Sequence, residues 1–373
     1  MKEVKVGFDA KRIFHNTTGL GNYSRDLVRI LAEYYPKNTY YLYNPKPKKV
    51  SRLQLTSSMV EVLPKSALWK KLSSLWRQKA IVKQLREDGI GIFHGLSGEI
   101  PRDLKKHNIK SVVTIHDLIF MRYPNLYSFI DRKIYFAKFK YAAKNADKVI
   151  AISEQTKRDI IKFLKIDESK IEVIYQGCSN VFKEISTEKE KNNLIDKYKL
   201  PKKFLLNVGT IEERKNALTI VKAIKDLKIP LVIVGRKTKY YELIKTYIEE
   251  NDITDKVFFL EGLTLKELAI IYQIAEIFIY PSIFEGFGIP IIEALYSGTP
   301  VITSKEGVFP EAGGDNSLYI NPYDPEELKT KIELLLKSEE RKLKMIEKGK
   351  EYVQRFNDES IVENVINLYN KLL

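Results

Sequence analysis

Residues 277–295 read IFIYPSIFEGFGIPIIEAL: a β-branched and aromatic run, a loop with two glycines, and an apolar run that begins near Pro290. This order predicts a strand, a turn and a helix, which is half of a βαβ unit. Similar short runs alternate with longer helical patterns along the whole chain, and this alternation predicts an α/β protein with parallel sheets. The other runs that we expect to form strands are residues 4–8, 39–43, 91–94, 111–116, 148–152 and 171–175 in the first half, and 204–208, 230–234, 257–260, 300–303 and 317–320 in the second.

The length of 373 residues fits two doubly wound, Rossmann-like sheets better than one very large sheet. A Gly, Ser and Asn cluster at residues 176–180 separates the two sets of expected strands. We therefore predict a first domain over about residues 1–177 and a second over about residues 200–354. Ligands of doubly wound sheets bind outside the carboxyl ends of the strands, so we expect the site in the cleft between the domains.

The charge is divided unevenly between these two halves. The chain carries 63 Lys and Arg against 48 Asp and Glu, a formal charge of +15. Residues 1–180 hold 34 of the basic and 17 of the acidic residues, a balance of +17, and the rest of the chain has a balance of −2. Such an excess favours an anionic partner: nucleic acid, a membrane surface or a phosphorylated substrate.

The single cysteine, Cys178, cannot form an internal disulfide, which favours a reducing compartment. We expect neither a signal peptide nor a membrane-spanning helix, because no run of eighteen apolar residues occurs. The 44% content of hydrophobic residues excludes a disordered or collagen-like chain.

The loop of residues 281–290 carries the strongest site signal. Gly286 and Gly288 let backbone approach a ligand closely, and the N–H groups at the start of the following helix would face an anion. Glu285 precedes the helix and Glu293 lies about one turn inside it. Two carboxylates on either side of a phosphate-sized nest can bind sugar hydroxyls at both ends of a nucleotide sugar. The alternative is that Glu293 only solvates a helix.

A second strand, turn and helix pattern contains Gly209, Arg214 and Lys215, with the helix expected to run to about Leu227. Cations at a helix start oppose the macrodipole, and a bound diphosphate would relieve that conflict. A solvated helix start is the plainer interpretation of this segment alone.

Two weaker signals lie in the first half. Gly19 and Gly21 precede a helix expected over residues 23–34 and suit a glycine loop over a phosphate-bearing ligand, although they fail the dinucleotide fingerprint. His116, with Asp117 beside it, ends an expected strand, where a neutral imidazole can bond a sugar hydroxyl. No DxD pair, HExxH, Cys/His cluster, GxSxG or P-loop occurs, so we predict no metal and no cofactor.

Taken together and in this order, these strings resemble the family 4 glycosyltransferases of the two-Rossmann-domain GT-B type, from residue 7 to about 367. The matches are the E-x7-E pair (Glu285 and Glu293), the basic pair (Arg214 and Lys215) and the glycine loop of the first domain (Gly19 and Gly21). The resemblance implies a retaining, metal-independent hexosyltransferase that uses a nucleotide sugar. It also implies that the C-terminal helix, about residues 355–373, crosses back onto the first domain, which would bind the acceptor.

The resemblance also assigns roles to the residues. The donor would lie in the second domain, near Gly209, with Glu293 on the ribose and Glu285 on the sugar. Arg214, Lys215 and the amides near Phe287 and Gly288 would stabilise the diphosphate, and His116 would contact the donor sugar from the first domain.

Residues 7–12 and 18–23 look most like those of bacterial mannosyltransferases of surface-polysaccharide synthesis, so we predict GDP-mannose as donor and a glycan or lipid-linked acceptor. A UDP- or dTDP-sugar donor is one alternative. An epimerase or phosphorylase on the same fold is another.

Residues 68–86 look like one helix with Trp69 and Trp76 among lysines and arginines, and a second basic, aromatic stretch covers residues 132–148. These patterns suit an anionic membrane surface, although an ordinary amphipathic helix packed on the sheet explains the first of them equally well. We predict a cytoplasmic enzyme that is peripheral on the inner face of the cytoplasmic membrane. A nucleic-acid-binding protein is the rival, but no recognisable motif supports it, so no nucleic-acid partner is expected.

Overall fold

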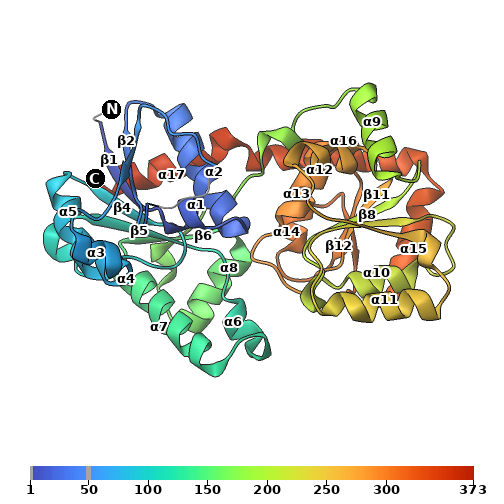
Figure 1. Cartoon of the computed structure of the whole chain (residues 1–373), viewed down its shortest axis with the longest axis horizontal. Helices are drawn as coiled ribbons and strands as arrows, with labels where there is room; N and C mark the ends of the chain where they lie inside the picture. Colours follow the sequence, from blue (N-terminus) through green and yellow to red (C-terminus); the bar gives the residue numbers. More distant parts are fainter. Residues whose placement is uncertain (1–2, 48–51) are drawn as a thin grey trace. The chain divides into compact units, whose positions relative to one another are not determined.

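The structure is a computed structural model that describes residues 3–47 and 52–373 (Figure 1). Its chain divides into two compact units, one of Met1–Gln176 with Asp358–Leu373 and the other of Gly177–Asn357. The second unit therefore begins some twenty residues before the predicted residue 200, because α9 (Glu188–Tyr198) packs on α12 (Leu265–Ile274).

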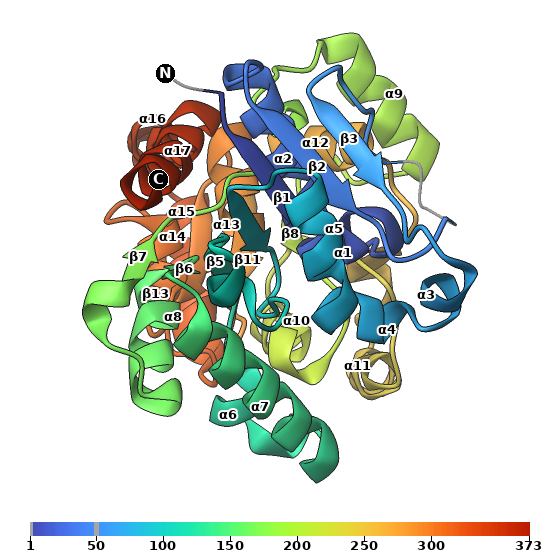
Figure 2. The ribbon, with the colours of Figure 1, turned by 90° about the vertical axis from the view of Figure 1, so that its left-hand side faces the viewer.

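The first unit contains a seven-stranded sheet in which every pairing is parallel (Figure 2). The strand order is β3-β2-β1-β4-β5-β6-β7. Its strands are β1 (Lys5–Asp9), β2 (Thr39–Tyr43), β3 (Met59–Val62), β4 (Ile92–Gly95), β5 (Lys110–Ile115), β6 (Lys148–Ala151) and β7 (Ile171–Val173).

Helices cover both faces of this sheet, so alternate strand residues enter two separate hydrophobic clusters. One cluster lies under α2 (Gly19–Tyr34) and α17 (Asp358–Leu372), and the other under α5 (Ile81–Glu87) and α7 (Phe129–Asn145). The helices of the unit are α1 (Lys11–His15), α2 (Gly19–Tyr34), α3 (Ala67–Lys71), α4 (Ser73–Leu75), α5 (Ile81–Glu87), α6 (Ile119–Arg122), α7 (Phe129–Asn145), α8 (Glu154–Asp159) and α17 (Asp358–Leu372).

The second unit contains a six-stranded parallel sheet in the order β10-β9-β8-β11-β12-β13. Its strands are β8 (Leu205–Val208), β9 (Leu231–Val234), β10 (Val257–Leu260), β11 (Ile277–Tyr280), β12 (Val301–Ser304) and β13 (Leu318–Ile320). Besides α9 and α12, its helices are α10 (Ala217–Ala223), α11 (Tyr240–Glu250), α13 (Ile289–Ser297), α14 (Phe309–Gly313), α15 (Pro325–Leu336) and α16 (Glu339–Val353).

The strand order reverses once in each sheet, between β1 and β4 in the first and between β8 and β11 in the second. These reversals are the topological switch points at which doubly wound sheets bind ligands. The predicted α/β class with two Rossmann-like sheets is confirmed.

Two local predictions are wrong, and one strand was missed. Gly19 and Gly21 lie in the first turn of α2, not in a loop before it. Residues 68–86 do not form one helix: α3 and α4 are followed by a π-helical turn, η1 (Trp76–Ala80), and then by α5. Trp76 is buried, so it cannot face a membrane. Strand β3 was not predicted at all.

Candidate functional site

The two strands at the switch point of the second unit carry the predicted donor residues. Gly209 follows β8, and a short 3-10 turn, η7 (Glu213–Lys215), comes next. Asn216 then takes a positive φ of 58° and α10 begins at Ala217. Arg214 and Lys215 therefore precede the helix and do not start it, so the predicted conflict with the macrodipole does not arise.

Glu285, in the loop after β11, receives its contacts on a single oxygen. Lys215 Nζ and Arg214 Nη1 each lie 2.6 Å from Glu285 Oε1. The hydroxyls of Ser282 and Tyr280 donate to the same atom at 2.8 and 3.0 Å. These contacts leave Oε2, with its lone pairs, for a ligand hydroxyl.

The loops after β8 and β11 are also joined by backbone. The Arg214 carbonyl accepts from Ile283 N at 2.9 Å and from Ser282 Oγ at 3.1 Å. The Arg214 guanidinium donates to the Phe284 carbonyl and to Glu212. These bonds hold the loop that carries Arg214 against the loop that carries Glu285.

The electrostatics of this cluster favour charged side chains. Burial disfavours the ionised form of Glu285, but Lys215 and Arg214 outweigh it and lower the pKa of the carboxyl to about 2. Burial lowers the pKa of Lys215, and the neighbouring Arg214 acts in the same direction. Glu285 is therefore an anion at neutral pH.

Glu293 has a different environment on α13. Tyr272, from α12, donates to its Oε2 at 3.0 Å. Burial raises the pKa of Glu293 to about 7, and the Tyr272 bond and Lys215 only partly oppose this. Each of the two glutamates is thus held through one carboxyl oxygen. Near neutral pH Glu285 is an anion, whereas Glu293 is only partly ionised.

Gly288 is the N-cap of α13 and has a φ of 106°, a conformation that residues with a Cβ rarely adopt. The preceding side chain, Phe287, is buried and stacks edge to face on Phe356 with centroids 5.2 Å apart. Only the backbone of Phe287 can therefore contact a ligand.

His116 directly follows β5 in the first unit, and its ring is buried. Its Nε2 donates to the Leu96 carbonyl at 2.9 Å, and the ring packs edge to face on Tyr23 with centroids 4.5 Å apart. Burial lowers the pKa of His116 to about 4, so the ring is neutral and its Nδ1 is an acceptor. The neighbouring Asp117 accepts from Ile119 N through Oδ1 at 3.0 Å.

The structure gives Gly21 a packing role. A Cβ at Gly21 would lie 2.2 Å from the Asn16 carbonyl oxygen, whereas a Cβ at Gly19 would meet nothing within 4 Å. Gly21 thus allows α2 to approach the chain at Asn16. Of the two glycines, Gly19 alone has open space beside it.

Sequence reasoning missed a second charged cluster, at the switch point of the first unit. Asp9 is the last residue of β1 and pairs with Arg77, from η1. Glu99, in the segment after β4, lies 3.4 Å from Arg77. The strand-end aspartate was a visible signal, but the pairing with a residue 68 positions away was not.

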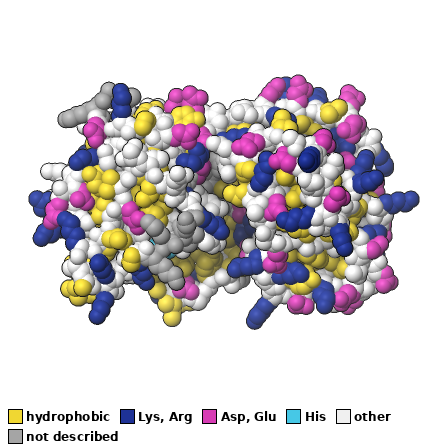
Figure 3. All heavy atoms as spheres, turned by 45° about the horizontal axis from the view of Figure 1, so that its top comes forward, with side chains coloured by type: hydrophobic (Ala, Val, Ile, Leu, Met, Phe, Trp, Pro, Cys, Tyr) yellow, Lys and Arg dark blue, Asp and Glu magenta, His cyan; other side chains and the backbone are white. Residues whose placement is uncertain are grey.

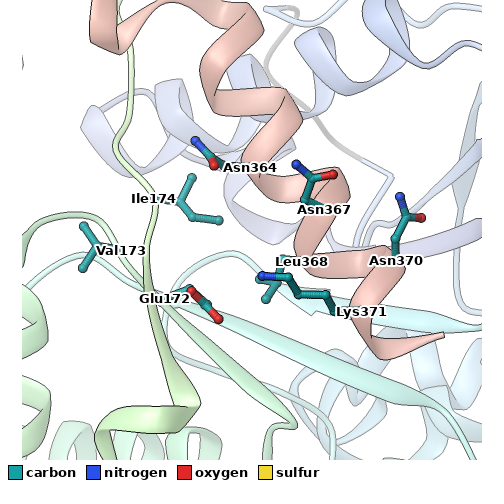
Figure 4. Close-up of a pocket in the computed structure, with 8 residues that line it drawn as sticks. All are labelled: Glu172, Val173, Ile174, Asn364, Asn367, Leu368, Asn370 and Lys371. Carbon is teal, nitrogen blue, oxygen red and sulfur yellow. The ribbon is translucent and has the colours of Figure 1, made fainter.

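A pocket of about 440 Å³ lies between β7 and α17, lined by three asparagines of α17 and by Glu172 (Figure 4). It contains none of the predicted site residues, so we do not assign the chemistry to it. Within residues 3–47 and 52–373, no group of three or more His, Cys, Asp or Glu is arranged to hold a metal ion.

Solved structures share this architecture over the whole chain. Sucrose-phosphate synthase from Thermosynechococcus elongatus matches with a TM-score of 0.79 at 22% identity, covering 99% of both chains. HepE from Anabaena, in complex with UDP, matches with a TM-score of 0.78 at 15% identity over 99% of this chain and 100% of that one. The fold is therefore the GT-B fold of glycosyltransferases.

Family models match both halves of the chain. The model described as Glycosyltransferase Family 4 covers residues 17–179, and the model described as Glycosyl transferases group 1 covers residues 187–352. The chain belongs to the family 4 glycosyltransferases.

Among curated relatives, O-antigen chain mannosyltransferase RfbU of Salmonella typhimurium is 34% identical over 249 residues, which are 66% of this chain and 63% of that protein. O-antigen chain mannosyltransferase B of Escherichia coli is 25% identical and covers 99% of this chain and 100% of its own length. The serotype-specific mannosyltransferase WbdA of E. coli is 28% identical, and the match covers only 32% of its length.

Proposed function

We propose that this protein is a retaining, metal-independent mannosyltransferase that transfers mannose from GDP-mannose to a glycan or lipid-linked acceptor in surface-polysaccharide synthesis. The observation that carries the proposal is the cluster of Glu285, Arg214 and Lys215 at the switch point between β8 and β11. A nucleotide sugar presents a diphosphate and hydroxyls, and this cluster offers two cations beside a carboxylate oxygen that is free to accept.

Each group of the donor has a partner in the proposed arrangement. Arg214 and Lys215 neutralise the diphosphate, together with the amides near Phe287 and Gly288 at the start of α13. Glu285 accepts from sugar hydroxyls through Oε2, and Glu293 accepts from the ribose hydroxyls through Oε1. Because Glu285 now engages both cations, donor binding requires the diphosphate to share them.

The proposed chemistry proceeds on one face of the sugar. The bond between the anomeric carbon and the diphosphate oxygen breaks, and the acceptor oxygen bonds to the same carbon. The acceptor proton passes to the leaving phosphate oxygen, so no side-chain base is required. Arg214 and Lys215 stabilise the charge that develops on the leaving diphosphate, which is usually the largest electrostatic contribution to such a step. In this scheme His116, neutral and with Nδ1 as acceptor, bonds a hydroxyl of the donor sugar.

The choice of mannose is supported by the names of the relatives, since RfbU, mannosyltransferase B and WbdA are all called mannosyltransferases. Thermal unfolding of the whole chain with GDP-mannose, UDP-glucose and dTDP-rhamnose tests the donor directly. We expect GDP-mannose to give the largest shift in Tm, because only a bound ligand stabilises the folded state. A larger shift with either of the other sugars contradicts the GDP-mannose assignment.

We further propose that the enzyme is peripheral on the inner face of the cytoplasmic membrane and contacts an anionic surface through α7. Phe129, Ile130 and Ile134 in its first half are 64, 69 and 45% exposed. Lys133 Nζ lies 4.5 Å from the centre of the Phe129 ring. Exposed apolar side chains among cations are typical of helices that bind anionic lipid. The basic residues of α7 are Arg132, Lys133, Lys138, Lys140 and Lys144, against the single acid Asp131.

The charge of the two halves supports this assignment to the first unit. The excess of +17 lies in residues 1–180, while the second half is nearly neutral. On the face shown in Figure 3, Lys and Arg lie beside Asp and Glu over the second unit, at the right. Within the described part of the chain, no helix is both long and apolar enough to cross a bilayer.

A further inference from the structure

The charged cluster at the switch point of the first unit occupies a place where ligands bind in doubly wound sheets. Asp9 ends β1, and Glu99 lies four residues beyond the end of β4, so the cluster draws on both strands of the reversal. Arg77 joins them. Its Nε donates to Asp9 Oδ1 at 3.1 Å, and its Nη2 bonds Asp9 Oδ2 and lies 3.4 Å from Glu99 Oε2.

Stability alone is a poor explanation of this cluster. The side chains of Arg77 and Asp9 are only 11 and 12% exposed. Withdrawing such charges from water costs more free energy than a buried pair commonly recovers, so apolar residues would stabilise the sheet at least as well. The turn that carries Arg77, η1, is π-helical, a rare conformation that occurs frequently at functional sites.

The cluster still has hydrogen-bonding capacity. The bonds of Arg77 described above use Nε and Nη2, which leaves the two N–H groups of Nη1. Asp9 Oδ1 also accepts from Lys11 N at 3.1 Å, so the remaining lone pairs are on Asp9 Oδ2 and on the two oxygens of Glu99. Lys138 Nζ, from α7, lies 3.2 Å from Glu99 Oε1 and adds a second cation. The charges of these two carboxylates and two cations cancel, and Lys11, which interacts electrostatically with Asp9, Glu99 and Arg77, adds one further cation. The cluster therefore offers carboxylate acceptors beside guanidinium donors, the combination that the hydroxyls of a polyol require.

We propose that Asp9, Arg77 and Glu99 bind a pyranose residue of the acceptor. Arg77 Nη1 donates to one ring hydroxyl, while the carboxylates of Asp9 and Glu99 accept from its neighbours. Donors and acceptors that are fixed side by side match the vicinal hydroxyls of a sugar. The inference rests on the proposed function only in taking the bound sugar to be the acceptor of the transfer.

Binding of octyl α-mannopyranoside and octyl α-glucopyranoside to the whole chain, without nucleotide, tests the site by saturation-transfer NMR and calorimetry. We expect a glycoside to bind, and its affinity to fall about tenfold or more in Asp9→Asn and in Glu99→Gln, because each removes a charged acceptor. The matched control is Arg29→Gln, which breaks the ion pair of Arg29 with Asp358 between α2 and α17 and should leave glycoside binding unchanged.

The shift in Tm that GDP produces reports on the donor site. It therefore distinguishes a failure of this proposal from a failure of the proposed function. Glycoside binding that is weakened in Asp9→Asn and Glu99→Gln, with the GDP shift intact, supports the acceptor site. Equal glycoside binding in the variants and the wild type, or none in the wild type, overturns it. Binding of the glucoside alone, weakened in the same variants, also upholds the site, because the proposal names a pyranose and not a particular sugar. Glu99 is the more exposed of the two acids, at 24%, so Glu99→Gln keeps the test decisive if Asp9→Asn fails to fold.

Discussion

Glu285 and Lys215 form a largely buried ion pair across the switch point of the second sheet, with Nζ and Oε1 2.6 Å apart. Both side chains are 14% exposed, and Arg214 adds a second cation at 2.6 Å from the same oxygen. The pair therefore fixes a carboxylate and an ammonium at the carboxyl ends of β8 and β11 before any ligand arrives. Preorganised charge of this kind needs no rearrangement of solvent when the reaction creates new charge.

Replacing either member of this pair should abolish most transfer. We expect Glu285→Ala and Lys215→Ala each to lower kcat/KM by about 10²–10³-fold, because each removes a fixed charge from the developing transition state. Circular dichroism should show folded protein in both, since neither side chain belongs to the hydrophobic cluster of the second sheet. The measurement is transfer of labelled mannose from GDP-mannose to an isolated glycolipid fraction.

Lys329→Ala is the matched control for these variants. Lys329 also pairs with an acid, Asp226, but at the surface, where ion pairs contribute little. Full activity in Glu285→Ala or in Lys215→Ala would show that the pair does not take part in catalysis. The double variant should lose less than the product of the single losses, because the two residues act as one unit.

The stability of the protein should depend on Glu293 in a defined pH range. Its pKa is about 7 in the folded protein, above the ordinary value of 4.5. A raised carboxyl pKa means that the folded state binds more protons, so this residue lowers the free energy of unfolding as the pH rises from about 4.5 to 7. Glu293→Gln should not show this loss. The difference in the free energy of unfolding between the variant and the wild type should therefore move in favour of the variant by about 1–3 kcal/mol from pH 4.5 to pH 8. Urea unfolding of both proteins at pH 4.5 and at pH 8 measures these free energies. The same change with pH in the variant and in the wild type contradicts the prediction.

Nucleotide affinity should show the opposite dependence on the same group. If ionised Glu293 accepts from the ribose hydroxyls, GDP binding favours the charged form, so the affinity should rise from pH 6 to pH 8. In Glu293→Gln the affinity should be lower and nearly independent of pH over this range. Calorimetric titration with GDP distinguishes the two, and an equally pH-dependent affinity in the variant would assign the effect to another group.

The strands could be predicted because most are buried on both faces and appear as continuous apolar runs. Strand β3 was missed because it is an edge strand, where Glu61 interrupts the run and Val60 is 37% exposed. The break in residues 68–86 was missed because the helical spacing of apolar residues does not distinguish an α-helical turn from the π-helical turn at Trp76–Ala80.

The site was predictable only in part. The order of strand, glycine loop and helix placed Glu285 in the loop after β11, where it lies, but placed Lys215 at a helix start, whereas it lies in η7 before α10. That these residues, 70 positions apart, meet on one oxygen follows from the parallel pairing of β8 and β11, which no local pattern encodes. Arg77 was not predicted because a charged residue inside a helical pattern is usually solvated, and only the topology brings it to Asp9.

The two glycines at the start of α2 should respond differently to a methyl group. Gly21→Ala should lower the free energy of unfolding by about 1–3 kcal/mol, because its Cβ would lie 2.2 Å from the Asn16 carbonyl oxygen. Gly19→Ala has open space and should be neutral, or more stable by about 0.5–1 kcal/mol. Urea denaturation of both variants measures the difference, and equal midpoints contradict it. If Gly19 faces a ligand as predicted, Gly19→Ala loses transfer activity without losing stability.

Membrane binding should depend on the exposed face of α7. We expect the wild type to sediment with vesicles of phosphatidylcholine and phosphatidylglycerol but not with phosphatidylcholine alone. The reason is that α7 carries five basic residues and only one acidic residue. Phe129→Ser with Ile130→Ser should weaken binding about tenfold or more, because two large apolar side chains no longer leave water.

The control for this variant removes equally exposed apolar side chains elsewhere. Leu243 and Leu343, on α11 and α16, are 54 and 58% exposed, and Leu243→Ser with Leu343→Ser should bind vesicles like the wild type. Lys133→Glu with Lys140→Glu should abolish the preference for anionic lipid, and added salt should do the same to the wild type. Equal binding to neutral and anionic vesicles, or equal losses in the two serine variants, would show that α7 is not the contact. The basic excess of the first half would then require another partner.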